Sequence, residues 1–226
     1  MASDVSIGAP PNVEVEAVYE RFLALSPLLH PETGLGGKLF YIGELDMEGA
    51  RLVRAANIAG AASLSATSDP DGQRAAIREG VIDFLVTSLD EALRILKNEI
   101  RKKNPVAVGI SAPPSHVLAE MRKRGVLPDL LRDGCALDLA DFISKGAQPI
   151  GAAPPATLPR LIVLPSPPAG FENRALALIP ESEFAARRWV RLAPRYLGPS
   201  ARGIRTVPSS PAVAAELSIP PTPKPV

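Results

Sequence analysis

The chain has 226 residues, of which 46% are hydrophobic and 22% are charged. These values are typical of one globular domain of ordinary size with an appended segment. The formal net charge is +1, from 25 Lys and Arg against 24 Asp and Glu, so charge gives no reason to expect a nucleic acid or an anionic membrane as partner. The single cysteine, Cys135, excludes an internal disulfide and a cysteine-based zinc site, and we expect a reducing compartment, the cytoplasm.

The distribution of proline divides the chain. Of the 25 prolines, 16 lie between Pro149 and Pro225. No apolar run approaches the roughly 20 residues of a membrane span, and the first residues lack the pattern of an export signal. The organisation that we predict is an N-terminal helical segment at 1–35, an α/β domain at 36–148, a proline-rich strand and helix extension at 149–198, and a tail rich in Pro and Ser at 199–226. We expect this tail to be disordered or draped over the surface.

The first element that the sequence predicts is a helix at 13–25, whose Val15, Val18 and Phe22 would pack on the domain that follows. Apolar runs of strand length then alternate with helical patterns, which is typical of parallel strands joined by crossover helices. The fold class is therefore α/β, with a doubly wound parallel sheet. The expected strands are 38–43, 61–67, 81–86, 106–110 and 129–132, and the expected helices are 47–59, one ending at Gly80, one starting near Leu89, and 115–124.

Two strand-like runs and a helix are expected beyond this domain. The runs are 160–164 and 175–179, and the helix starts at Glu181 or Ser182 and ends at Pro194. Trp189 lies among arginines in this helix. It either packs onto the chain's own domain or forms a contact surface for a partner.

The turn after the first strand has the form of an anion site. A helix that starts directly after a parallel strand offers free backbone amides and a partial positive charge. Gly43 would supply the turn and Gly49 would allow close packing. Glu44, Asp46 and Glu48 surround these glycines, and such acids stabilise a helix start but repel a phosphate. They could also hold a divalent metal, although capping is the commoner role of such residues.

Several motifs together resemble the NAD-binding domain of urocanase, the urocanate hydratase of histidine breakdown. The resemblance covers about 36–138, including the spacing between motifs, and it supports the Rossmann-like fold. The motifs are GELDMEGAR at 43–51, AANIAGAA at 55–62, SATSDPDGQRAAIREGVIDFLVTSLDEAL at 65–93, PVAVGIS at 105–111 and HVLAEMRKRGVLPDLLRD at 116–133.

The resemblance implies NAD as cofactor and indicates which residues would hold it. The family's loop reads G-L-G-G-M-[GS]-G-A-Q, which Gly43, Met47, Gly49 and Ala50 match, whereas acidic residues and Arg51 depart from it. Further expected cofactor positions are Thr67, where the family has an acid for the ribose, and Asp133 and Cys135, in the segment where the family has D-Q-T-S-[AL]-H.

The departures in these loops leave several functions open. Pro113 and Pro114 stand where the family has a G-N-A turn, and the larger body that supplies the hydratase residues has no counterpart here. We expect no catalytic residue and no metal, and a binding or assembly module whose extension contacts a protein partner or a second copy. The alternatives are a lyase of the urocanate hydratase type, or a subunit of one, that binds NAD or a nucleotide, and a regulator that contacts a true urocanase. Cys135 could be reactive, although a quiet thiol is the simpler interpretation.

Overall fold

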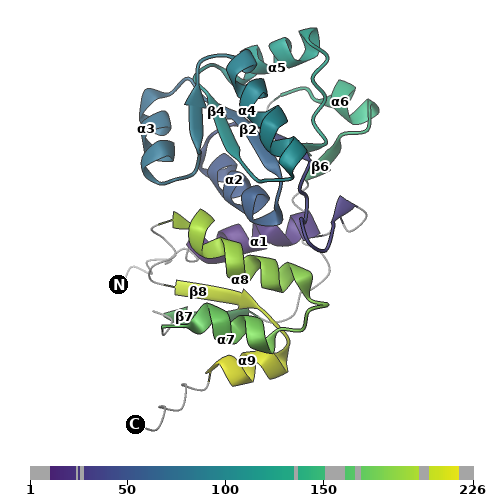
Figure 1. Ribbon diagram of the computed structural model, residues 1–226. Coiled ribbons are helices and arrows are strands. Elements are labelled where there is room, and N and C mark those ends of the chain that lie inside the picture. The colour runs from purple at the N-terminus through teal and green to yellow at the C-terminus, as the bar shows by residue number, and fades with distance from the viewer. Residues whose placement is uncertain are drawn as a thin grey trace, which may run out of the picture.

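The computed structural model places a parallel α/β sandwich above a smaller helical layer that carries a two-stranded sheet (Figure 1). Among the described residues, no helix combines the length and the apolar character that a membrane span requires. The structure describes residues 11–23, 25, 28–134, 137–150, 161–165, 169–198 and 204–218.

The main sheet has six strands in the order β3-β4-β2-β1-β5-β6, and every neighbouring pair is parallel. This arrangement confirms the doubly wound α/β fold. The sixth strand was not expected, because its sequence Gln-Pro-Ile has no strand pattern; Pro149 is tolerated there because the strand lies at the sheet edge. The strands are β1 Leu39–Glu44, β2 Ala62–Ala66, β3 Phe84–Val86, β4 Ala107–Ile110, β5 Leu130–Arg132 and β6 Gln148–Ile150.

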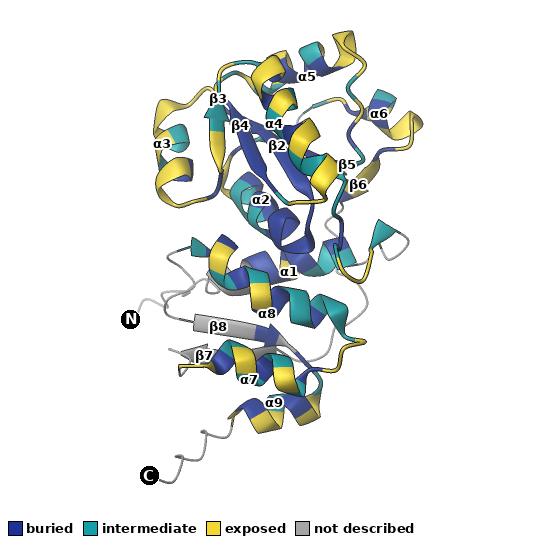
Figure 2. Cartoon of the chain, viewed as in Figure 1, coloured by how far each residue is buried: buried dark blue, intermediate teal, exposed yellow. Residues whose placement is uncertain are grey.

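Helices cover both faces of the sheet and bury the inner strands β1, β2, β4 and β5, whereas the edge strands β3 and β6 stay partly exposed (Figure 2). On one face lie α2 (Met47–Ala59) and α3 (Pro70–Arg78), and on the other α4 (Leu89–Lys102), α5 (Pro114–Lys123) and the short α6 (Ala140–Ser144). The helix starts follow the local sequence, since side chains of Asp46, Asp69 and Ser88 cap α2, α3 and α4.

Two further helices extend the layer around α2. The N-terminal helix α1 (Pro11–Leu23) buries Phe22 edge-on against Phe40 of β1, with ring centroids 5.3 Å apart. From the extension, α8 (Phe184–Tyr196) brings Trp189 to 5.1 Å from the ring of Tyr19. Trp189 is only 1% exposed, which confirms that this residue packs onto the chain's own domain.

The extension differs from the expected elements in three places. Residues 175–179 were expected as a strand, but they belong mostly to the helix α7 (Phe171–Leu178). The strand prediction was wrong because alternating Ala and Leu also suit a helix, in which Phe171 and Ala175, one turn apart, are both buried. Helix α8 also continues past Pro194, where its end was expected, since the burial of Ala193, Tyr196 and Leu197 stabilises its last turn.

The third difference concerns the segment that was expected to be disordered. Strand β8 (Ile204–Pro208) pairs antiparallel with β7 (Leu161–Pro165), which agrees with the run expected at 160–164, and α9 (Pro211–Ser218) follows. The prediction of disorder is wrong for these residues, because Val207, Val213 and Leu217 are buried in a core with α7 and α8.

Candidate functional site

The candidate site lies at the carboxyl ends of the parallel strands, next to the pair β1 and β5. From β1 the chain crosses to β2 on one side, whereas from β5 it crosses to β6 on the other side. Such a switch point opens a crevice in doubly wound sheets, and ligands usually bind there. The loops after β1 and β5 therefore form the first place to test for a cofactor.

The connection from β1 to α2 is built on two glycines. Gly43 has a φ of +75° and lies near the end of β1, within the strand expected at 38–43, at a shift of register with β2. Gly49 lies in the first turn of α2, where an added Cβ would be only 2.3 Å from the Glu44 carbonyl oxygen. Gly49 therefore allows the close approach of helix and strand that was expected of it.

Asp46 occupies the N-terminus of α2. Its Oδ1 accepts a hydrogen bond of 2.6 Å from the Gly49 amide, which is one of the donors that a bound phosphate would use. This geometry supports capping as the role of Asp46. The positive end of the helix is thus in contact with a carboxylate of the chain itself.

Arg132, the last residue of β5, holds this carboxylate from the opposite side. Its Nη1 donates to Asp46 Oδ1 at 2.9 Å and its Nη2 donates to Oδ2 at 3.1 Å, so the pair is bidentate. Nη1 also donates to the Glu44 carbonyl at 3.2 Å. The side chain of Arg132 is 13% exposed and that of Asp46 is 48% exposed, so the pair forms part of the wall of the crevice.

The charge of Asp46 is stabilised by these contacts. Partial burial opposes the charge, but the hydrogen bonds from Arg132 and the Gly49 amide outweigh it and lower the pKa of Asp46 below its ordinary value. Asp46 therefore carries its negative charge at neutral pH at the position where a pyrophosphate would lie.

The neighbouring acid Glu48 points to other partners. It forms ion pairs with Arg51, at 3.2 Å, and with Arg21 of α1, at 3.6 Å. Glu48 thus links α1 to α2 and does not cap the helix. Within the described ranges, no group of three or more His, Cys, Asp or Glu side chains is arranged to hold a metal ion.

The end of β2 offers no free acid for a ribose. Thr67 is 4% exposed, and its Oγ1 accepts a hydrogen bond of 3.3 Å from the Asp69 amide. The Asp69 carboxylate caps α3, with bonds of 3.1 Å from the Asp71 amide and 3.0 Å from the Gly72 amide. Both positions are thus used to start the next helix.

An open cavity of about 330 Å³ lies between the starts of α2 and α3. Met47, which is 74% exposed, and Ala50 line it, but Gly43, Gly49 and Thr67 do not. Its charged lining residues are all acidic: Asp46, Asp69 and Glu79.

The loops after β4 and β5 add few donors. Pro113 and Pro114 occupy the start of α5, and neither has a backbone N–H to offer. Asp133 is exposed, and its Oδ1 accepts a hydrogen bond of 2.9 Å from the Gly134 amide. Cys135 lies outside the described residues, so its expected role stays a prediction.

Sequence reasoning missed Arg132, which proves central to the geometry. The signal was a basic residue at the end of the strand expected at 129–132, since the carboxyl ends of parallel strands lie at one sheet edge; only the structure shows that this strand pairs with β1. Of the expected residues, Gly43, Met47, Gly49 and Ala50 lie together in the β1–α2 connection. Asp133 follows Arg132 directly, and Thr67 lies at the end of β2.

Comparison with protein families gives a match to the model described as the urocanase Rossmann-like domain, over residues 15–148. The match begins inside α1, so it includes most of the helix that the sequence analysis set apart, and it ends at the first residue of β6. It spans more than half of the 226 residues. The chain therefore belongs to the urocanase family, through its Rossmann-like domain.

Proposed function

We propose that this protein is a urocanase-like Rossmann domain that does not bind NAD in the manner implied by the family resemblance, that has no hydratase activity, and that acts as a binding or assembly module. The observation that carries the proposal is the contact of Asp46 with the Gly49 amide and with Arg132. These residues do not fit a dinucleotide at this helix, because the chain's own carboxylate takes the place of the phosphate.

The magnitudes favour exclusion of a phosphate. A carboxylate in the first turn of a helix stabilises it by about 0.3–1 kcal/mol. Two like charges about 4 Å apart repel each other by about 4 kcal/mol at the effective dielectric constant of a protein surface. Arg132 offsets part of the charge, but three of its hydrogen bonds already go to Asp46 and to the Glu44 carbonyl.

Two other positions support the same conclusion. A dinucleotide extends from the first loop towards the end of β2, where Thr67 stands in place of the acid that the resemblance implies for the ribose. At the start of α5, Pro113 and Pro114 remove two backbone donors. Replacing Asp46 alone would therefore restore only part of a cofactor site.

In the proposed assembly role, the surface that contacts the partner belongs to the C-terminal extension. The inner side of α8 is covered by α1 and α2, so a partner, or a second copy of the chain, would contact the outer side of the extension. We place this module in the cytoplasm. Light scattering coupled to size-exclusion chromatography of the full chain tests self-association directly.

A second candidate function is the binding of a nucleotide or another small ligand in a rearranged crevice, as a lyase or a subunit of one. The cavity of about 330 Å³ beside Met47 favours it, because this volume is within the range of ligand sites. The acidic lining of the cavity disfavours phosphates and leaves the first proposal better supported.

Calorimetric titration with NAD distinguishes the two candidates. The unmodified chain is expected to show no binding up to millimolar NAD. The variant Asp46→Ser removes the carboxylate but keeps an oxygen that can cap α2, and we expect weak NAD binding to appear in it. The matched control is Asp129→Ser, since Asp129 also pairs with a cation, Lys38 at 3.0 Å, but lies before β5, at the amino ends of the strands.

Micromolar binding by the unmodified chain would overturn the proposal and support the second candidate. Equal NAD binding by Asp46→Ser and Asp129→Ser would show that the charge of Asp46 is not what excludes the cofactor. Hydration of urocanate by the isolated chain would contradict the assignment as a binding module.

A further inference from the structure

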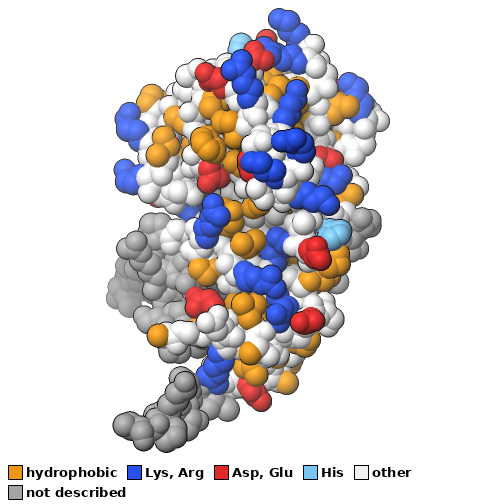
Figure 3. All heavy atoms as spheres, viewed as in Figure 1, with side chains coloured by type: hydrophobic (Ala, Val, Ile, Leu, Met, Phe, Trp, Pro, Cys, Tyr) orange, Lys and Arg blue, Asp and Glu red, His pale blue; other side chains and the backbone are white. Residues whose placement is uncertain are grey.

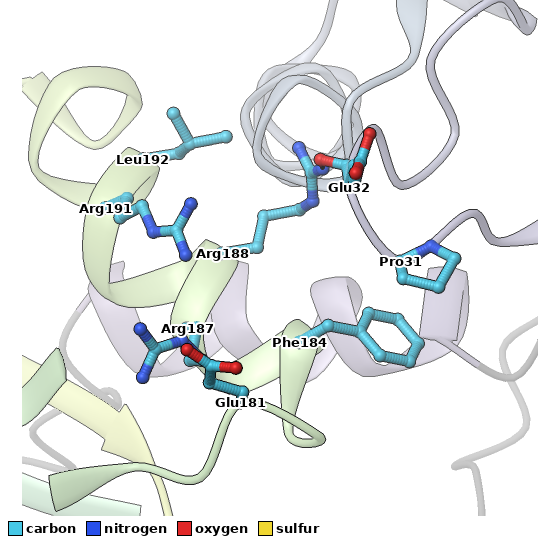
Figure 4. Close-up of a pocket in the computed structure, with 8 residues that line it drawn as sticks. All are labelled: Pro31, Glu32, Glu181, Phe184, Arg187, Arg188, Arg191 and Leu192. Atoms are coloured by element: carbon cyan, nitrogen blue, oxygen red, sulfur yellow. Dashed lines mark hydrogen bonds between the residues drawn. The ribbon is translucent and has the colours of Figure 1, made fainter. Parts of the chain in front are cut away.

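A second cavity, of about 380 Å³, lies far from the strand ends, between α8 and the loop that precedes β1 (Figure 4). Helix α8 contributes Phe184, Arg187, Arg188 and Arg191, and the loop contributes Pro31 and Glu32. Lys and Arg side chains are spread over much of the visible face, including the part that α8 occupies (Figure 3). The chemistry of this cavity is not that of the crevice described above.

The arginines reach this cavity because α8 has two different sides. Trp189, Ala193 and Tyr196 are buried and fix the helix against the domain. Arg187, Arg188 and Arg191 are separated by one, three and four positions, so that they share the side turned to the cavity. The docking of α8 thus brings three guanidinium groups to one wall.

Two of these arginines are held in place by neutral acceptors. Arg187 Nη1 donates to the carbonyls of Leu176, at 2.5 Å, and Ile179, at 2.6 Å, at the end of α7. Arg188 Nη2 donates to the carbonyl of Glu32. Carbonyl oxygens fix the position of a guanidinium without cancelling its charge.

No ion pair joins a carboxylate to Arg187, Arg188 or Arg191 within the part of the chain that the structure describes. Burial lowers the pKa of Arg188, the nearby Tyr19 opposes this effect, and the charge of Arg191 lowers the pKa further. The charges of Arg188 and Arg191 are therefore close enough to repel each other, and an anion at this wall would relieve the repulsion.

The free donors and the remaining lining define what such an anion would look like. The bonds to the carbonyls of Leu176 and Ile179 use only Nη1 of Arg187, so its Nε and Nη2 can still donate to a ligand. Arg187 lies one helical turn before Arg191, and one guanidinium group can bind two phosphate oxygens at once. Phe184, Leu192 and Pro31 add apolar surface for an organic body. Glu32, on the loop before β1, and Glu181, just before α8, also line the cavity, so the anionic end of a ligand would be directed to the arginines of α8 and away from these acids.

We propose that this cavity binds a small phosphorylated metabolite, with its phosphate between Arg187 and Arg191 and its organic part against Phe184. The volume of about 380 Å³ is at the small end of the range for ligand sites, which favours a small molecule over a peptide segment. The site is independent of the β1–α2 crevice, so it stands or falls separately from the proposed function.

Phenyl phosphate is the probe of choice, because it combines a phosphate with an aromatic body. Calorimetric titration of the full chain is expected to give binding that Arg191→Gln weakens at least tenfold, because two charge-assisted hydrogen bonds are lost. Arg191 is exposed, so this variant is expected to fold normally. The matched control is Arg195→Gln, one turn further along α8, since Arg195 is also exposed but does not line this cavity.

Three results would overturn the proposal. The first is the absence of binding at phenyl phosphate concentrations up to about ten times 1 mM. The second is binding that Arg191→Gln and Arg195→Gln weaken equally. The third is binding of inorganic phosphate as tight as that of phenyl phosphate, which would show that Phe184 does not contribute. A phosphoserine peptide that binds much more tightly than phenyl phosphate would assign the arginines to a protein partner instead.

Discussion

At the scale of single residues, the carboxylate of Asp46 occupies the start of α2. Capping and the ion pair with Arg132 both follow from one side chain at the start of α2, and the proposed exclusion of phosphate rests on the same side chain. In other proteins a bare glycine loop leaves the same amides free for a ligand. Here the Gly49 amide already donates to a carboxylate of the chain itself.

Gly49 yields a sharp prediction at this scale. Gly49→Ala is expected to lower the free energy of unfolding by about 1–3 kcal/mol, because the added Cβ would meet the Glu44 carbonyl oxygen at 2.3 Å. The gain of about 1 kcal/mol from the higher helix propensity of alanine does not offset such a clash. Urea unfolding followed by circular dichroism measures the change.

The matched control for this prediction is Gly72→Ala. Gly72 has the same position in α3 as Gly49 has in α2, three residues after an aspartate cap, but its nearest atoms belong to the side chain of Asp69, at 3.0 Å, which can move. A change near zero is expected. Equal destabilisation by both variants would show that the close approach of α2 to β1 does not matter for stability.

At the scale of elements, α8 joins the extension to the Rossmann-like domain. Trp189 is its largest buried side chain, in contact with Tyr19 of α1, whose hydroxyl donates to the Ala185 carbonyl at 2.9 Å. Burial raises the pKa of the Tyr19 hydroxyl above its ordinary value, so it stays protonated and remains a donor. The interface is thus an apolar contact with a hydrogen bond at its edge.

Trp189→Ala is expected to destabilise the protein by about 3–5 kcal/mol, which is the usual cost of deleting a buried aromatic side chain. Urea unfolding again provides the measurement. Leu127→Ala serves as the control, since Leu127 is 50% exposed and its loss is expected to change stability by less than about 0.5 kcal/mol. A cost below 1 kcal/mol for Trp189→Ala would mean that α8 does not dock as described.

At the scale of the whole molecule, α8 belongs to two cores at once. One core joins it to α1, α2 and the sheet, and the other joins it to α7, β8 and α9. The second core is small, so its stability depends on the buried side chains that β8 and α9 contribute to it. Removing those residues should affect one core and leave the other intact.

A chain that ends at residue 198 lacks β8 and α9 and tests this division. Amide hydrogen exchange in α7 is expected to become at least tenfold faster, because Val207, Val213 and Leu217 no longer cover it. Exchange in β1, β2 and β4 should not change. The control chain ends at residue 218 and keeps both elements; faster exchange throughout the sheet of the shorter chain would show that the two cores form one cooperative unit.

Much of the fold was accessible from the sequence because local patterns and local structure agreed. Apolar periodicity predicts β1 and α2, and the glycine at position 60 predicts where α2 ends. In the structure Gly60 has a φ of +100° and follows the last residue of α2. The order of the six strands did not follow from the sequence. Strand β6 was missed because a three-residue edge strand with a proline is stabilised by pairing with β5 and not by its own residues. The disorder expected after residue 198 was wrong for β8 and α9, since composition does not reveal which few apolar side chains find a core.

The sequence by itself determined the α/β class, the β1–α2 connection and the acids that surround it, because each depends on residues close together in the chain. Only the tertiary structure decided how those acids act. Arg132 lies 86 positions from Asp46 and reaches it only because the sheet places β5 beside β1. The arginines of α8 likewise form a cavity wall only after that helix has docked, since contacts between distant segments depend on packing and not on local pattern.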